Sequence, residues 1–363
     1  MKITGAVARA GARDFDLSAL ELREPKAHEV LVKMVATGLC HTDLIVRDQW
    51  FPTPLPAVLG HEGAGIVQSV GPAVTTVEAG DHVVLSYNSC GNCRNCRSAK
   101  PNYCGQFWDY NFSATVPGGE PTLTENGVVI GGNFFGQSSF ATFAIASDRV
   151  LVRVNDDVPL EILGPLGCGI QTGAGAVLKT LRPHAAASIA VFGAGAVGLS
   201  AVMAAKLSGC TRILVVDKVE SRLELALELG ASDTWMAAGD NARDIRRATH
   251  GGVQFAIEAT GVPRVLRNAM DSLAPGGTCA LVGAAAARAT AEIDISTLLF
   301  GRKLVGVIAG DAIPQVFVPE LIDLYVNGLF PFTKLLTQYP HTDINVAISD
   351  AESGVSVKPV VLW

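Results

Sequence analysis

Residues 188–217, SIAVFGAGAVGLSAVMAAKLSGCTRILVVD, decide how the second half of this chain folds. Their first five residues form an apolar run typical of a buried strand, and glycines follow at 193, 195 and 198. A helix-length apolar segment then leads to a second strand-like run, which ends at Asp217, 19 residues after the third glycine. A strand, a glycine-rich turn, a helix and a second strand with a terminal acid form a pattern that binds dinucleotides.

The glycine turn has a physical role in such a site. Glycines let the backbone approach a pyrophosphate, and the start of the helix supplies oriented N–H groups with a partial positive charge. Asp217 would accept hydrogen bonds from ribose hydroxyls and repel a 2′-phosphate, which favours NAD over NADP, although Lys218 and Arg222 lie nearby. A packing turn that binds no ligand is the alternative. The predicted cofactor-binding residues here are Gly193, Gly195, Ala196, Val197, Gly198, Asp217 and Arg222.

The sequence around this turn predicts two kinds of structure. After residue 170, strand-like runs alternate with helical stretches, one of which is ended by Gly230, and this alternation predicts a parallel sheet covered on both faces. Residues 1 to about 150 instead contain short β segments separated by Gly, Pro and Asp, which predict a β-rich module. The expected strands are 29–36, 64–70, 81–86, 140–146, 188–192, 212–216, 255–258, 278–282 and 304–308.

Composition excludes several classes of protein. A length of 363 residues favours two domains, and 28 basic against 34 acidic residues give a net charge of −6, which argues against a nucleic-acid partner. The N-terminus lacks the apolar core of a signal peptide, so we expect a cytoplasmic protein without a disulfide framework. Residues 185–205 are long and apolar enough to cross a bilayer, but three internal glycines favour a soluble strand–turn–helix and no membrane partner.

Four of the eight cysteines lie in one short segment. Residues 90–104, CGNCRNCRSAKPNYC, are rich in polar residues and offer no apolar face for a core. Thiolates at this spacing can close on one ion, and four of them complete a tetrahedral shell, so we predict a structural zinc site. Reduced cysteines without metal are the alternative. The predicted ligands are Cys90, Cys93, Cys96 and Cys104.

Other cysteines and one histidine stand in unusual settings. Cys40 follows an apolar strand in ATGLCHTD, His61 lies among glycines in LGHEGAG, and Cys168 lies in GCGIQTGAG. Taken singly, each is better explained as a buried thiol or a hydrogen-bonded core histidine than as a metal ligand. Cys210 and Cys279 have apolar, strand-like neighbours and are expected to be inert.

The motifs in their order along the chain resemble the zinc-dependent medium-chain alcohol dehydrogenases. GHEGAG, the four-cysteine segment, GCGIQTGAG and GAGAVG followed by VVD carry the resemblance, which extends from about residue 25 to residue 360. GLCHTDLIVRDQ, LSYNSCGNC and FFGQSSFAT are most similar to the benzyl-alcohol branch, with geraniol dehydrogenases as near relatives. The resemblance implies a GroES-like catalytic domain, residues 1–169 and 310–363, with a Rossmann domain inserted at 170–309.

The resemblance also implies a catalytic zinc, and hence two zinc ions per subunit. Its ligands would be Cys40, His61 and Cys168, with Glu62 close to the metal and Asp43 orienting the histidine. Three protein ligands leave one position for the alcohol or aldehyde oxygen. A zinc ion there makes an alcohol easier to deprotonate, so that a hydride can pass to the nicotinamide ring.

Further roles follow from the same resemblance. Thr42 would contact the alcohol oxygen and start a proton relay, but Ile45 stands where well-known animal enzymes carry a histidine and cannot pass a proton. His41 and Lys358 would bind the pyrophosphate, and Thr172 would contact the nicotinamide; a solvated surface lysine is the alternative for Lys358. The implied substrate pocket contains Phe51, Ser86, Phe134 and Ile308.

Clustered aromatic residues indicate the substrate class. Eight of them fall in three short stretches, 50–51, 107–112 and 134–135, although packing in a core or an interface is an alternative. An aromatic slot favours planar or unsaturated groups, so we expect a primary aryl or allylic alcohol, with terpenoid or broad-range medium-chain alcohols as the alternative. A zinc-free reductase and an NAD-binding scaffold are competing classes. The long 105–132 segment and the family resemblance favour a homodimer over a tetramer.

Overall fold

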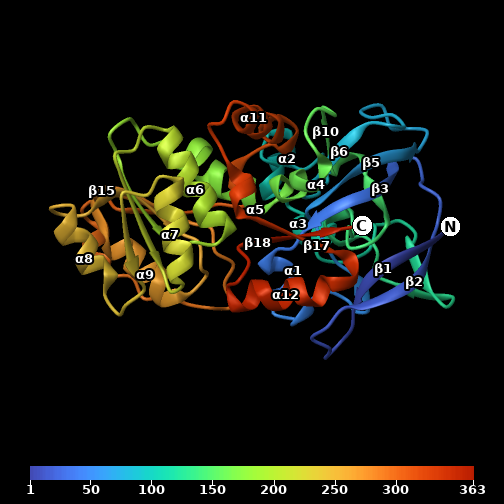
Figure 1. Ribbon diagram of the computed structural model, residues 1–363, viewed down its shortest axis with the longest axis horizontal. Coiled ribbons are helices and arrows are strands. Elements are labelled where there is room, and N and C mark those ends of the chain that lie inside the picture. Colours follow the sequence, from blue (N-terminus) through green and yellow to red (C-terminus); the bar gives the residue numbers. More distant parts are fainter. The chain divides into compact units, whose positions relative to one another are not determined.

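The computed structural model describes all 363 residues, and their contacts form two units. Unit 1 contains Met1–Cys168, Ile313–Glu320 and Leu335–Trp363, and unit 2 contains Gly169–Ala312 and Leu321–Lys334. Both ends of the chain therefore belong to unit 1 (Figure 1). The sequence-based boundaries assign residues 169, 310–312 and 321–334 to the first domain, whereas the contacts place them in unit 2.

Unit 2 is built on a six-stranded parallel sheet in the order β13-β12-β11-β14-β15-β16. The chain starts the sheet at β11 and adds β12 and β13 on one side, then crosses to the other side to add β14, β15 and β16. The direction in which strands are added therefore reverses between β11 and β14. Ligands of such sheets bind at the carboxyl ends of the strands beside this reversal. The strands are β11 (Ser188–Phe192), β12 (Arg212–Asp217), β13 (Asp233–Met236), β14 (Val253–Glu258), β15 (Leu273–Leu281) and β16 (Lys303–Gly306).

Helices lie between these strands in the sequence and surround the sheet (Figure 1). Gly230 ends α7 with a φ of 125°, a conformation that residues with a Cβ rarely adopt, as its place after the apolar pattern predicts. The helices of unit 2 are α5 (Gly169–Gly175), α6 (Ala196–Leu207), α7 (Glu220–Leu229), α8 (Asn241–Ala248), α9 (Pro263–Asp271) and α10 (Ile295–Leu298).

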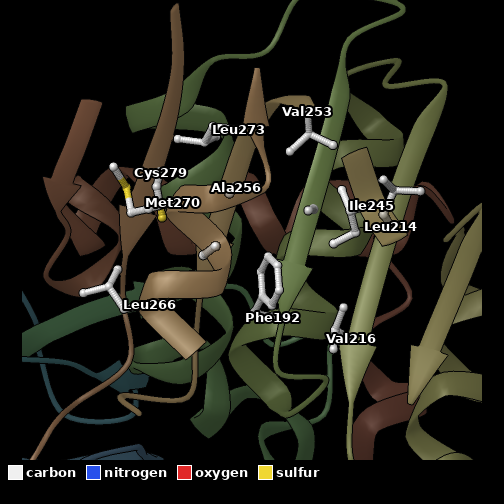
Figure 2. Packing of buried hydrophobic residues seen from close by; sticks show 12 residues of the cluster. Phe192, Leu214, Val216, Ile245, Val253, Ala256, Leu266, Met270, Leu273 and Cys279 are labelled. Carbon is white, nitrogen blue, oxygen red and sulfur yellow. The ribbon is translucent and has the colours of Figure 1, made fainter. Parts of the chain in front are cut away.

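A continuous apolar core fills the space between the sheet and its helices. Phe192 and Leu214 from the strands meet Ile245 of α8 and Met270 of α9 in this core (Figure 2). The neighbouring strands β11 and β12 read as apolar runs because both faces of the sheet are covered there. Cys279 is fully buried here, as predicted for an inert cysteine, whereas Cys210 is only half-buried.

Unit 1 contains a five-stranded sheet, β4-β1-β2-β7-β8, and a seven-stranded one, β10-β6-β5-β3-β18-β17, in which β9 also pairs with β3. All strand pairs are antiparallel except β17 with β18. The strands are β1 (Lys2–Ala8), β2 (Asp16–Leu22), β3 (Glu29–Gly38), β4 (Ala57–Val58), β5 (Gly63–Val70), β6 (His82–Leu85), β7 (Leu123–Glu125), β8 (Val128–Ile130), β9 (Phe143–Ser147), β10 (Leu151–Val154), β17 (Leu336–Pro340) and β18 (Lys358–Leu362).

The last strand brings the C-terminal segment to the middle of unit 1. Val360 pairs with Gly38, so Lys358 at the start of β18 lies close to the end of β3. The short helix α1 (His41–Arg47) begins directly after this point. The remaining helices are α2 (Arg94–Arg97), α3 (Phe107–Asn111), α4 (Leu160–Leu163), α11 (Pro314–Val326) and α12 (Ile344–Ser353). None of the helices has the length and apolar character needed to cross a bilayer.

These two architectures are those expected from the sequence: a β-rich GroES-like part and a doubly wound parallel sheet of the Rossmann type. The fold-class prediction is therefore confirmed.

Candidate zinc centre and dinucleotide site

One buried carboxylate organises the candidate catalytic site. Asp43, in the first turn of α1, accepts a hydrogen bond from the Cys40 N–H at 3.0 Å, which caps the start of the helix. Its other oxygen accepts hydrogen bonds from the Gly60 N–H at 3.2 Å and from His61 Nδ1 at 2.9 Å. Asp43 therefore links the two chain segments that carry Cys40 and His61.

The orientation of His61 leaves one nitrogen available for a metal. Because the Asp43 carboxylate only accepts hydrogen bonds, Nδ1 carries a proton, and in the neutral imidazole the lone pair is then on Nε2. Nε2 is buried and has no hydrogen-bond partner in the protein. The ligand atoms of Cys40, His61, Glu62 and Cys168 all lie within 4.8 Å of one another. Two thiols and an imidazole with an unpartnered nitrogen fit a zinc ion that keeps an open position.

A buried ion pair lies against these residues. Lys358 Nζ is 2.5 Å from Glu62 Oε2 and donates a hydrogen bond to the Leu39 carbonyl at 3.0 Å. Burial raises the pKa of Glu62 to about 7, while the charge of Lys358 opposes that shift. The pKa of Cys40 lies well below its ordinary value because of its hydrogen bond with Cys168 and the nearby charge of Lys358. The site thus favours a thiolate at Cys40.

The position of Lys358 corrects one sequence-based interpretation. A solvated surface lysine was the alternative, but the residue is only 2% exposed and paired with Glu62. Burial alone would lower its pKa, but the charges of Glu62 and Cys40 raise it. Its expected contact with a pyrophosphate stays a prediction.

The other residues expected from α1 differ in exposure. His41 is exposed, Thr42 is half-buried in the first turn, and Ile45 is 2% exposed. Thr42 lies in the first turn of α1, directly before the buried Asp43, and its expected contact with the alcohol oxygen stays a prediction. The apolar environment of Ile45 offers no route for a proton.

Of the residues expected to line the substrate pocket, two are buried and two are partly exposed. Ser86 is buried, and its hydroxyl donates a hydrogen bond to the carbonyl of Gly167, the neighbour of Cys168. Phe134 has no exposed surface and packs edge-on against the His61 ring, with centroids 5.7 Å apart. Phe51 is half-buried, and Ile308, in unit 2, is 41% exposed.

A set of aromatic rings extends outward from His61. Phe112 contacts Phe134 at 5.9 Å between ring centroids, Trp108 at 4.4 Å and Phe51 at 5.7 Å. Trp108 is 55% exposed, so the rings form a path from the histidine to the surface of unit 1.

The four-cysteine segment forms a second candidate metal site. The Sγ atoms of Cys90, Cys93, Cys96 and Cys104 all lie within 4.8 Å of one another. Backbone N–H groups, including that of Gly105 at 3.4 Å from Cys93 Sγ, point at the sulfurs. Hydrogen bonds from the backbone of Cys96 and Gly105 lower the pKa of Cys93 to about 6. The residues fit a closed structural zinc site with four sulfur ligands.

The glycine turn of unit 2 leaves space for a ligand. Gly193 has a φ of 100°, and a Cβ on Gly198 would lie 1.7 Å from the Gly193 carbonyl oxygen, so both positions require glycine. A Cβ on Gly195 would meet nothing within 4 Å, which leaves the start of α6 open to an anion. Asp217 accepts hydrogen bonds from the N–H groups of Ala194 at 2.6 Å and Val219 at 2.9 Å.

The remaining residues expected to bind the cofactor also lie near this turn or on α5. Arg222 is half-buried in α7, and Thr172, on α5, is 8% exposed. Ala196 and Val197 open α6. Their contacts with a dinucleotide stay predictions.

Sequence reasoning did not assign a role to Gln137 or Phe135. Gln137 is fully buried and donates hydrogen bonds to the carbonyls of His61 at 3.0 Å and Ser86 at 2.9 Å. The Phe135 ring lies against the His61 ring, with centroids 4.5 Å apart. The pair of adjacent phenylalanines was the only sequence feature that drew attention to this segment. The sequence of the segment does not show that it contacts the loop of His61.

Comparison with known proteins agrees with this geometry. Residues 26–156 match the model of the alcohol dehydrogenase GroES-like domain, and residues 196–327 match the zinc-binding dehydrogenase model. A geraniol dehydrogenase from Castellaniella defragrans is 44% identical over 99% of this chain and 97% of its own.

The chain belongs to the zinc-dependent medium-chain alcohol dehydrogenases.

Two solved structures are also similar over the whole chain. A benzyl alcohol dehydrogenase from Acinetobacter calcoaceticus has a TM-score of 0.96 and 48% identity, and it covers 100% of this chain and 99% of its own. An alcohol dehydrogenase zinc-binding domain protein from Burkholderia ambifaria has a TM-score of 0.97 and 49% identity, with the same coverage. The predictions of the family, of an alcohol dehydrogenase activity and of zinc and NAD as cofactors are confirmed at this level.

Proposed function

We propose that this alcohol dehydrogenase oxidises primary aryl or allylic alcohols of the benzyl type to aldehydes with NAD, and catalyses the reverse reaction. The observation that carries the proposal is the set of aromatic rings between His61 and the surface. Planar groups stack well against such rings, whereas ethanol offers them little area. The similarity to a geraniol dehydrogenase and to a benzyl alcohol dehydrogenase supports the same class.

In this proposal each residue of the candidate catalytic site has a defined role. Cys40, His61 and Cys168 hold the catalytic zinc, and Asp43 keeps His61 in the tautomer that presents Nε2. When bound, zinc supplies a Lewis acid that polarises the substrate oxygen. The Thr42 hydroxyl, which bonds no other protein group, is available to accept the proton of the alcohol. Because Ile45 blocks a side-chain relay, we expect water to carry that proton onward.

A steady-state comparison of alcohols tests the substrate class. With NAD, kcat/KM for benzyl alcohol and cinnamyl alcohol should exceed that for ethanol by about 100-fold, since burying a ring contributes about 3 kcal/mol of apolar contact. A higher kcat/KM for geraniol than for benzyl alcohol would favour the terpenoid alternative. A higher kcat/KM for ethanol than for either would refute the proposal.

The cofactor preference rests on Asp217. Its carboxylate lies at the end of β12, and a 2′-phosphate near it would be repelled. We therefore propose that kcat/KM with NAD exceeds that with NADP. Equal values would show that Lys218 or Arg222 compensates for the acid.

We further propose that two copies associate along β16, an end strand of the sheet in unit 2, with the exposed apolar residues that precede it. Strand β16 is one end strand of the six-stranded sheet, and β13 is the other. Leu299 and Phe300, just before it, are 85% and 68% exposed, and Nε and Nη1 of the buried Arg302 have no partner in the chain. Sedimentation should give a dimer for the native chain and a monomer for Phe300→Asp. A native monomer would contradict the proposal, and a native tetramer would require a second contact.

A further inference from the structure

Residues 134–140, FFGQSSF, wrap around the loop that carries His61; we call them the collar segment. The N–H groups of Ser139 and Phe140 donate to the carbonyls of Gly60 and Leu59 at 3.0 Å. Ser138 Oγ donates to the Val58 carbonyl at 2.7 Å. The collar segment therefore follows the backbone that leads into His61.

Three side chains of the collar segment act on His61 itself. The ring of Phe135 lies over the imidazole at 4.5 Å and 31°, and the ring of Phe134 meets it at 5.7 Å and 89°. Gln137 donates to the His61 carbonyl at 3.0 Å and accepts from the Gly63 N–H at 3.1 Å. The imidazole itself is held by three groups: Asp43 accepts a hydrogen bond in the ring plane, Phe135 lies against the ring face, and Phe134 makes a T-shaped contact. Gln137 holds the backbone on either side.

The backbone of the collar segment is strained at the residue that covers the imidazole. Phe135 has φ 52° and ψ 29°, the left-handed region that a bulky residue rarely occupies, and Ser138 has φ 50°. Glycine would adopt this conformation without strain. A phenylalanine at such a position indicates that its side chain makes a contact that a relaxed residue could not supply.

We propose that Phe135 is a positioning residue: its ring, held over the face of His61 by a left-handed backbone, fixes the plane of the imidazole and so the geometry of the catalytic metal. This inference rests on the proposed role of His61 as a zinc ligand. Asp43 alone constrains the direction of one ring nitrogen but leaves rotation about that hydrogen bond possible. A planar group against the ring face removes that freedom.

The alternative is that Phe135 only fills space in unit 1. The two roles differ in what a glycine does at this position. Phe135→Gly relieves the backbone strain but removes the ring, whereas Phe135→Leu keeps apolar bulk without a planar face. Asn126→Gly is a matched control, because Asn126 has φ 50° in the turn between β7 and β8 and touches none of the metal-binding residues.

The test uses the zinc-loaded protein and a cobalt-substituted form. We expect Phe135→Gly to release the metal of the cysteine–histidine site to a chelator about 10-fold faster than the native protein. The cobalt d–d bands of this site should shift, while the four-cysteine site keeps its native spectrum and release rate. Phe135→Leu should show the same shift with a smaller change in rate, and Asn126→Gly should show neither.

The outcomes separate this inference from the proposed function. If the native chain binds two metal ions and oxidises alcohols, but both Phe135 variants match it in release rate and cobalt spectrum, the positioning role is wrong. If the native chain binds only the ion of the four-cysteine site, the proposed function fails and this inference fails with it. If Phe135→Gly does not fold, a native release rate and spectrum in Phe135→Leu would overturn the role.

Discussion

Asp43→Asn should weaken the candidate catalytic metal site and also lower the stability of unit 1. The carboxylate accepts from Gly60 and His61 at one oxygen and from Cys40 at the other. An asparagine has a single acceptor oxygen, so its amide must face at least one of these donors with a donor of its own.

The size of the effect follows from the contacts that are lost. If the amide oxygen faces Cys40, the His61 Nδ1–H loses its acceptor; if it faces His61, the Cys40 N–H does. One buried hydrogen bond to a charged group stabilises a fold by about 1.5–3 kcal/mol, so we expect a loss of that order in the free energy of unfolding. A lost partner of a ligating histidine lowers metal affinity by about 10–100-fold.

Competition with a chelator measures the affinity of each metal site, and denaturant unfolding measures stability. Asp48→Asn is the matched control: Asp48 caps the other end of α1, is paired with Arg47 at 2.7 Å and has a side chain that is 41% exposed. The Asp48 carboxylate bonds only the Arg47 guanidinium, so this substitution should leave metal affinity unchanged, whatever it costs in stability beside the buried arginine. Native metal affinity in Asp43→Asn would show that Asp43 does not orient a zinc ligand.

Three other substitutions have expected outcomes. Glu29→Gln should lower stability by about 1–2 kcal/mol at pH 7: burial raises the pKa of Glu29, but Arg23 outweighs it and holds the pKa below its ordinary value. A lowered folded-state pKa stabilises the fold above the ordinary pKa, so the difference from the native protein should vanish in unfolding titrations as the pH falls through the lowered pKa of Glu29. Cys104→Ser should lose one zinc ion and lower the unfolding temperature, as elemental analysis and calorimetry would show. Gly198→Ala places a Cβ 1.7 Å from a carbonyl oxygen and should abolish NAD binding in a fluorescence titration; native affinity would contradict this account of the turn.

Local sequence patterns predicted the structure correctly where the residues that decide it are close together in the chain. The expected strand at 188–192 matches β11, and the spacing of four cysteines within one segment brings their sulfurs together. Helix α7 ends where Gly230 predicts. In each case the residues that decide the structure are neighbours in the sequence.

Contacts between distant segments could not be predicted in this way. Lys358 and Glu62 are far apart in the chain and meet only because β18 pairs with β3. Phe134 was assigned to the substrate pocket only through the family resemblance, and no local pattern shows that its ring meets that of His61. Residues 321–334 follow a segment of unit 1, yet their contacts are in unit 2, which no local pattern shows.

The zinc content of the native protein and of His61→Ala tests the central claim most directly. We expect two zinc ions per native chain and one per variant chain, with kcat/KM for benzyl alcohol reduced at least 1,000-fold, in line with the loss of a metal that acts as a Lewis acid. A variant that keeps two zinc ions, or a native chain that holds one and still oxidises alcohols, would contradict the assignment of Cys40, His61 and Cys168 as the catalytic ligands.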